Sequence, residues 1–211
     1  MTDVVVQRPA TATVVPWLVL AAWAGASFSL ARARVFVEPP EALPLRLIAA
    51  VALPASIFLT AYALMPAVQR WVEALDMAAV VGVQTWRVIG VVFVVLWAMG
   101  TLPAAFALTA GLGDIAVGVL AIGVTLAVAR RVPGWQGRVR LLIVAGMIDF
   151  VGAFGTAILV APGRILAGGP TAEMMQVLPL ALIPAFGVPL FMILHLIAWL
   201  KLRSARHPDR M

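Results

Sequence analysis

Long apolar runs separated by short polar stretches dominate the pattern of this chain. Runs without any charged residue cover residues 14–30, 47–69, 88–113 and 174–200. A further run, 141–163, contains a single charged residue, Asp149. A helix of about 20 mainly apolar residues crosses the roughly 30 Å of hydrocarbon in a bilayer. The pattern therefore predicts an all-α integral membrane protein.

We expect a bundle of about six membrane-spanning helices that forms a single polytopic domain over residues 1–211. The expected spans are residues 14–30, 47–65, 77–100, 113–129, 139–160 and 177–200. The stretch 77–129 is too long for one span, so a turn must interrupt it. We place a short irregular segment at 101–112, because the residue before Pro103 is disfavoured in a helix. Pro179, Pro184 and Pro189 should kink the last helix.

Two segments leave alternatives open. Residues 31–33 fit a small-residue cleavage site, so the run 14–30 could belong to a signal peptide. The positive charge before it is weak, and we therefore expect a retained span. Residues 66–76 carry apolar positions at helical spacing among polar ones, which indicates a short interfacial helix or an ordinary loop helix. We favour the loop helix.

Charge is scarce and lies near the ends of the expected spans. The chain is 64% hydrophobic and 11% charged, with a net charge of +6. Nucleic-acid binding would need a basic platform facing water, and the pattern predicts none. Six spans would place both chain ends on one side of the membrane.

The basic residues predict which side that is. On the side of the chain ends lie Arg8, Arg70, Arg130, Arg131, Arg138, Arg140, Lys201, Arg203, Arg206 and Arg210. On the other side lie Arg32, Arg34, Arg46 and Arg164. The positive-inside rule then predicts both termini in the cytoplasm, in a bacterial-type inner membrane. The cytoplasmic basic loops should contact anionic lipid headgroups.

Asp149 is the strongest candidate for function, because a carboxylate in hydrocarbon must be neutral, paired or facing a cavity. Small residues share its helix face, at Gly146, Gly152, Ala153 and Thr156, and predict that it points into the bundle.

Arg87 and His195 fall at an expected depth similar to that of Asp149. Gln84 lies on the same helix face as Arg87. These residues predict a small polar cavity in the cytoplasmic half. Arg87 would bind an anion or act as counter-ion, Asp149 would hold a proton or cation, and His195 would titrate. The alternatives are a purely structural Arg87–Asp149 pair with His195 bonded to a carbonyl, or an Arg87 that snorkels to the interface.

The string Gly111-Leu112-Gly113-Asp114 resembles the GxGD signature of intramembrane aspartyl proteases, such as signal peptide peptidases. In that family the aspartate is one of two catalytic carboxylates, so the resemblance implies a catalytic Asp114. The second aspartate should lie on a preceding span, whereas here Asp149 lies on a later one. The resemblance covers only this string, and we favour Asp114 as the N-cap of the fourth span, near the outer face.

No cofactor is expected. The chain has no cysteine, its candidate metal ligands are sparse, and His195 alone would give a membrane haem only one axial ligand. The preferred function is transport or permeation of a small solute or ion, coupled to protons through Asp149. The alternatives are an intramembrane hydrolase using Asp114 and Asp149, and a structural or accessory subunit. Association with a second copy or another membrane protein stays open.

Overall fold

The computed structural model describes residues 10–39, 42–162, 164–166 and 169–205. Within these residues the protein is all-helical, and six helices are long and apolar enough to cross a membrane. These spans are Val14–Arg32, Leu45–Leu64, Met77–Ala98, Ala104–Ala129, Trp135–Leu159 and Ile183–Ser204. The prediction of an all-α bundle of about six spans is confirmed, and the protein is a multi-pass membrane protein.

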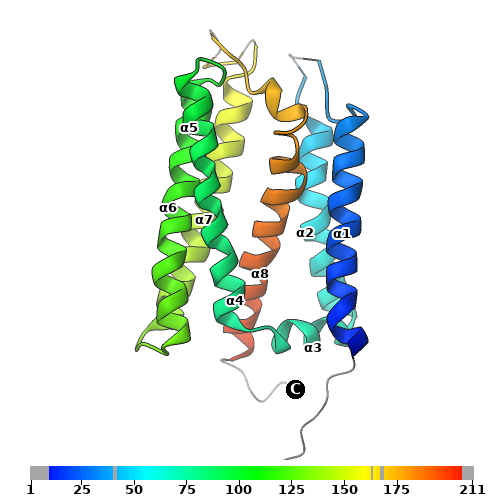
Figure 1. The fold of residues 1–211 in the computed structure, drawn as a ribbon, viewed down its shortest axis with the longest axis vertical. Helices are drawn as coiled ribbons and strands as arrows, with labels where there is room; N and C mark the ends of the chain where they lie inside the picture. The colour runs from blue at the N-terminus through cyan, green and yellow to red at the C-terminus, as the bar shows by residue number, and fades with distance from the viewer. Residues whose placement is uncertain (1–9, 40–41, 163, 167–168, 206–211) are drawn as a thin grey trace, which may run out of the picture.

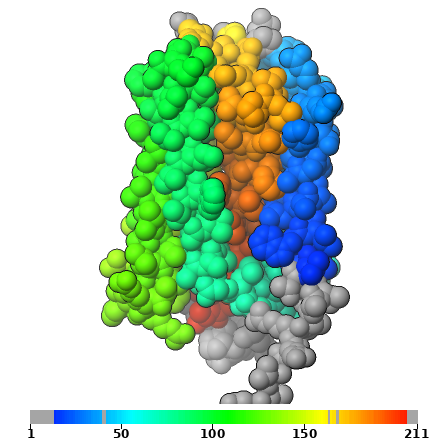
Figure 2. All heavy atoms as spheres, in the orientation of Figure 1, coloured from blue at the N-terminus to red at the C-terminus, as the bar shows by residue number. Residues whose placement is uncertain are grey.

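The helices form an elongated bundle with α8 between two groups of neighbours (Figure 1). On one side of α8 lie α1 and α2, and on the other lie α4 to α7. The bounds are α1 Ala10–Arg32, α2 Leu45–Leu64, α3 Pro66–Ala74, α4 Met77–Gly82, α5 Val91–Ala98, α6 Ala104–Ala129, α7 Trp135–Leu159 and α8 Val188–Ser204. Side chains fill the space between the ribbons, and α8 remains visible between α1 and the α4–α5 side (Figure 2).

The start of α1 and the end of α8 lie at the same end of the bundle, here called the terminal end (Figure 1). The short helix α3 lies across this end, where Lys201 Nζ donates to the carbonyl oxygens of Val72 at 3.1 Å and Glu73 at 2.7 Å. The assignment of this end to the cytoplasm remains a prediction. Arg8, Arg206 and Arg210, which contribute to the predicted orientation, lie outside the described residues.

The third span changes its helix type halfway across. It begins as α4, capped by Asp76, whose Oδ1 accepts the N–H of Ala79 at 2.7 Å. The 3₁₀ segment η1, Val83–Gly90, follows and leads into α5. A stretch of 3₁₀ helix inside a longer helix often marks strain or a functional hinge.

The fourth span begins earlier than the sequence predicted. Helix α6 starts at Ala104 with Pro103 as its N-cap, so residues 104–112 are helical rather than irregular. Asp114 therefore lies inside the helix, and its predicted role as a cap is wrong. The glycines before it serve close packing instead of a turn: a Cβ on Gly111 would lie 2.9 Å from the carbonyl oxygen of Gly90. Since α6 passes so near the third span, the two helices need small residues there.

The last span begins at Ile183 rather than at the predicted residue 177. A π-helical turn, Ile183–Gly187, precedes α8 and contains Pro184. Pro189 lies in the first turn of α8, directly after the π-helical turn, and its missing N–H removes one helical donor at this junction. The irregularity predicted from the prolines is thus concentrated at the start of the span.

Of three apolar clusters among the described residues of the bundle, the two larger ones lie one in each half. The terminal half holds a cluster that includes Val81, Val117, Leu142 and Ile197. The other half holds a cluster that includes Phe93, Phe106, Ala110 and Val160. Along α6, Asp114 lies between Ala110 and Val117, and therefore between the two clusters. The polar residues of the interior occupy this boundary.

Candidate functional site

Arg87 is the centre of the polar interior, and its side chain is 0% exposed. It lies ten residues after the start of the third span at Met77, about 15 Å into the bundle at 1.5 Å per residue. The alternative of an Arg87 that snorkels to the interface is therefore wrong. A buried guanidinium needs partners for its five N–H groups, and four residues of three other helices surround it.

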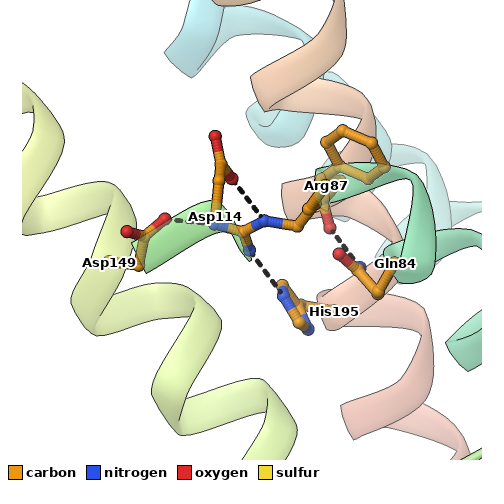
Figure 3. Close-up of polar contacts among 6 residues, drawn as sticks. Gln84, Arg87, Asp114, Asp149 and His195 are labelled. Atoms are coloured by element: carbon orange, nitrogen blue, oxygen red, sulfur yellow. Dashed lines mark hydrogen bonds and ion pairs between the residues drawn. The ribbon is translucent and has the colours of Figure 1, made fainter. Parts of the chain in front are cut away.

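Two carboxylates bind this guanidinium. Arg87 Nε donates to Asp114 Oδ1 at 2.7 Å, and Arg87 Nη2 donates to Asp149 Oδ2. Figure 3 shows the guanidinium between the two aspartates, which come from α6 and α7. The sequence had placed Asp114 near the outer face, away from Asp149. The structure brings it into the same site, because α6 starts nine residues earlier than expected.

His195 and Gln84 complete the polar layer. Arg87 Nη1 lies 3.4 Å from His195 Nε2, on α8. A guanidinium has only donors, so Nε2 accepts this bond and the ring is neutral with its proton on Nδ1. Gln84, on the same 3₁₀ segment as Arg87, donates from Nε2 to the carbonyl oxygen of Phe191 at 3.0 Å. Both Gln84 and His195 are buried, and their bonds tie η1 to α8.

Phe150 is a site residue that the sequence analysis missed. Its ring centroid lies 4.2 Å from Arg87 Cζ, close enough for a cation–π contact. The ring also packs edge-on against His195, with centroids 6.2 Å apart. An aromatic residue beside an intramembrane aspartate is a weak sequence signal, since most such residues only contact lipid or core. The contact became recognisable once Arg87 was placed.

Two glycines make room for the site. A Cβ on Gly113 would collide with the carboxylate of Asp149, and one on Gly146 would meet the imidazole of His195 and lie 2.9 Å from Arg87 Nη1. Gly146 belongs to the face of small residues predicted around Asp149. The side chains of His195 and Arg87 occupy the space that a larger residue at position 146 would need. At this level, polar side chains lie between the helices.

The charges of the site do not balance. One guanidinium faces two carboxylates, and the neutral His195 adds no charge, so the formal sum is −1. Within the described part of the chain, no second cation pairs with either aspartate, and Asp149 Oδ1 has no hydrogen-bond partner. A buried carboxylate oxygen without a donor is costly and calls for an explanation. The site is thus suited to accept a proton or a cation.

A cavity of about 110 Å³ leads from the aspartates toward the end of the bundle opposite the terminal end. Asp114 and Asp149 line its inner end, whereas Arg164 and Glu173 line its outer end. This cavity therefore lies in the half opposite the termini, whereas the sequence predicted one in the half that holds them. Arg87 does not line the cavity, so the proposed role of Arg87 as an anion clamp finds no support in this geometry.

Among the described residues, no group of three or more histidine, cysteine, aspartate or glutamate side chains is placed to hold a metal ion. The polar layer consists instead of one arginine with its partners. It combines a fixed cation, two acidic groups and a neutral imidazole in the middle of the bundle. The chemistry of such a set is that of cation binding and proton transfer.

Comparison with curated proteins and with solved structures finds no match. One protein family does match, over residues 44–203. This range starts just before α2 and includes Phe150 and the five polar site residues, Gln84, Arg87, Asp114, Asp149 and His195. Helix α1 lies outside the matched range. The match covers most of the chain, and the protein therefore belongs to the family described as Domain of unknown function (DUF8737).

Proposed function

We propose that the protein moves a small solute or ion across the membrane, and that the site formed by Arg87, Asp114 and Asp149 takes up and releases a proton in each cycle. The observation that carries the proposal is the surplus negative charge, since two carboxylates share one guanidinium at mid-depth. An unneutralised charge is costly in apolar surroundings. The site therefore alternates between a protonated form and a form neutralised by another cation.

The surroundings of the site support this cycle. The two aspartates bind the same guanidinium, so a proton on one changes the charge felt by the other and the pair titrates as a unit. The cavity gives the pair a route toward one end of the bundle. If both termini lie in the cytoplasm of an inner membrane, as the positive-inside rule predicts, this route opens to the outer side. We expect η1, which carries Arg87, to shift when the site changes charge.

An intramembrane hydrolase is the second candidate, because Asp114 and Asp149 lie at one guanidinium and both line the cavity. Aspartyl catalysis needs two carboxylates that share a proton across a water molecule. Here Arg87 donates to both aspartates, so its guanidinium, rather than a catalytic water molecule, lies between the two carboxylates (Figure 3). The arrangement supports ion binding better than hydrolysis. A structural or accessory subunit would use the same ion pairs only to fix helix packing.

The proposal can be tested with purified protein in liposomes that contain a pH-sensitive dye. A pH gradient is imposed, and panels of small amines, alcohols and carboxylates are added outside. We expect solute-dependent proton movement that Asp149→Asn abolishes while the variant stays folded. Glu73→Gln is a matched control, since it removes one negative charge from an exposed position on α3. Equal proton movement in the wild type and in Asp149→Asn would refute the role of the site.

Infrared spectroscopy tests proton uptake separately from transport. The wild type should show one carboxyl C=O band that titrates with pH and disappears in Asp114→Asn or Asp149→Asn. A spectrum without a titrating carboxyl band between acid and alkaline pH would contradict proton coupling. Hydrolysis of a membrane-spanning peptide that depends on both aspartates would favour the hydrolase instead.

A further inference from the structure

The groups that line the cavity indicate the charge of its ligand. At the inner end, the two aspartates face the cavity, while Arg87 lies behind them with its donors directed at Asp114, Asp149 and His195. An anion that reached this inner end would meet the two carboxylates before the guanidinium of Arg87. A cation, in contrast, would complete the charge balance of the site. The inner end therefore selects against anions.

The outer end of the cavity adds no net charge. Arg164 and Glu173 both line it, and their formal charges cancel. These groups are closer to water, where charges are screened and contribute little to selectivity. The preference for a cation therefore comes from the aspartates alone. Of these, Asp114 is the more accessible, with 19% of its side chain exposed compared with 7% for Asp149.

The walls between the two ends are apolar. Phe93 and Phe106 meet edge to face with ring centroids 5.6 Å apart, and Ala110 and Phe154 lie in the same wall. A hydrated metal ion has no apolar surface to bury against such walls, so they would not stabilise its binding. A ligand with a short apolar chain would bury that chain against them, which contributes about 0.8 kcal/mol per CH₂. The aromatic rings also favour an organic cation.

The size of the cavity limits this apolar part. Its volume of about 110 Å³ is smaller than the ~150 Å³ cavity that takes up benzene in a model protein. A short alkyl chain fits, whereas a fused ring system does not. The cavity is lined at its outer end by loop residues, so a ligand would enter from that end.

From these observations we infer that the cavity is a binding site for a small primary ammonium ion with a short alkyl chain, its NH₃⁺ group on Asp114 and Asp149. This assignment rests on the proposed function, because the ammonium ion and the proton neutralise the same pair of carboxylates. Binding of the amine at acid pH must therefore displace a proton. The protein would then exchange protons for small organic cations.

Calorimetry on the full-length protein in detergent tests the assignment with three probes of similar shape: n-butylammonium, 1-butanol and butyrate. Empty micelles provide the blank for partitioning. We expect n-butylammonium to bind, 1-butanol to bind at least about tenfold more weakly, and butyrate not to bind. The difference follows from the loss of one hydrogen bond to a charged group, which corresponds to roughly a 10- to 100-fold change in affinity. At acid pH the affinity for n-butylammonium should fall as protons compete.

Two variants locate the binding. Asp114→Asn keeps an oxygen for Arg87 Nε but removes the surplus charge, and should weaken n-butylammonium binding by about 10- to 100-fold. Ala110→Leu fills the apolar wall and should abolish binding with both carboxylates still present. Ala104→Leu, at an exposed position of α6, is the matched control and should bind as the wild type does. Circular dichroism and thermal unfolding of every variant identify any that fails to fold, and Ala153→Leu replaces Ala110→Leu in that case.

The possible outcomes distinguish an error in the assigned ligand class from an error in the proposed transport function. Butyrate binding as well as n-butylammonium, or undiminished n-butylammonium binding in both Asp114→Asn and Ala110→Leu, would overturn the assignment. If proton movement in liposomes depended on a neutral or anionic solute, the ligand class would be wrong and the proposed function would stand. If n-butylammonium bound as expected but moved no protons and did not cross the membrane, the site would stand and the function would fall.

Discussion

Replacing Arg87 by glutamine tests whether the site is held together by its charges. The wild-type side chain is 0% exposed and donates to Asp114 and Asp149, so Arg87→Gln leaves two carboxylates without their counter-ion. Removal of one partner from a buried ion pair costs about 3–5 kcal/mol, because the remaining charge stays buried. We expect Arg87→Gln to lower the free energy of unfolding by about this amount at neutral pH.

The loss should depend on pH. In Arg87→Gln the folded protein must protonate its carboxylates, so at neutral pH it binds more protons than the unfolded chain. The free energy of unfolding then falls as pH rises. The variant should therefore approach the wild type in acid and differ most from it at neutral and alkaline pH. A purely steric effect of the substitution would not change with pH.

Further substitutions separate charge from shape. Adding Asp114→Asn and Asp149→Asn to Arg87→Gln makes the site neutral, and should return stability to within roughly 2 kcal/mol of the wild type. Arg87→Lys keeps the charge, but one ammonium group cannot replace a fork that binds both aspartates and His195. It should have an intermediate effect.

The stability of each variant can be measured by reversible unfolding in mixed micelles of mild detergent and sodium dodecyl sulfate, followed by far-ultraviolet circular dichroism. The reasoning would be refuted if Arg87→Gln matched the wild type at neutral pH. It would also be refuted if the neutral triple variant were as unstable as Arg87→Gln. Either result would mean that the ion pairs are not what compensates for burying these groups.

Two further predictions concern single contacts. Gly146→Ala should be about 1–3 kcal/mol less stable than Gly155→Ala, because the Cβ at residue 146 would lie 2.8 Å from His195 Cε1, whereas the space beside Gly155 is open. Both substitutions gain equally in helix propensity, so equal stability of the two variants in the same unfolding assay would contradict the packing argument. Asp76→Ala should lower the free energy of unfolding by about 1 kcal/mol and Asp76→Asn by much less, since Asn can also cap α4. An equal loss of stability in both variants would show that the charge of Asp76 matters rather than its role as a cap.

The sequence predicted the fold well because hydrophobic length alone defines membrane spans. Each apolar run was long enough to cross the bilayer, and the six spans are present in the structure. The helix type inside a span left no such signal. The 3₁₀ segment Val83–Gly90 holds β-branched residues and a glycine, which form α-helices less readily than alanine or leucine, but that composition does not specify a 3₁₀ helix. Two residues of this segment, Gln84 and Arg87, make tertiary contacts with other helices, and such contacts are not visible in the local sequence.

Depth along each helix predicted part of the site. Arg87, Asp149 and His195 were expected at similar levels from counting residues in three spans, and the structure brings them together. Counting could not show which of them face the cavity, because that depends on the rotation of each helix. Arg87 and His195 lie behind the aspartates, and the cavity extends toward the other half of the bundle. The contact of Phe150 with Arg87 depends on rotation in the same way.

Asp114 shows how strongly one helix boundary affects a functional argument. With the fourth span starting at residue 113, the interior would hold Arg87 and Asp149 only, a balanced pair that needs nothing more. With the span starting at Ala104, Asp114 enters the interior and the formal charge of the site becomes −1. A balanced pair suits a structural role, whereas a surplus charge requires a proton or a ligand cation in the folded protein. The position of the N-terminus of α6 therefore removes the balanced pair on which a structural role would rest, and supports the proposed exchange of cations at this site.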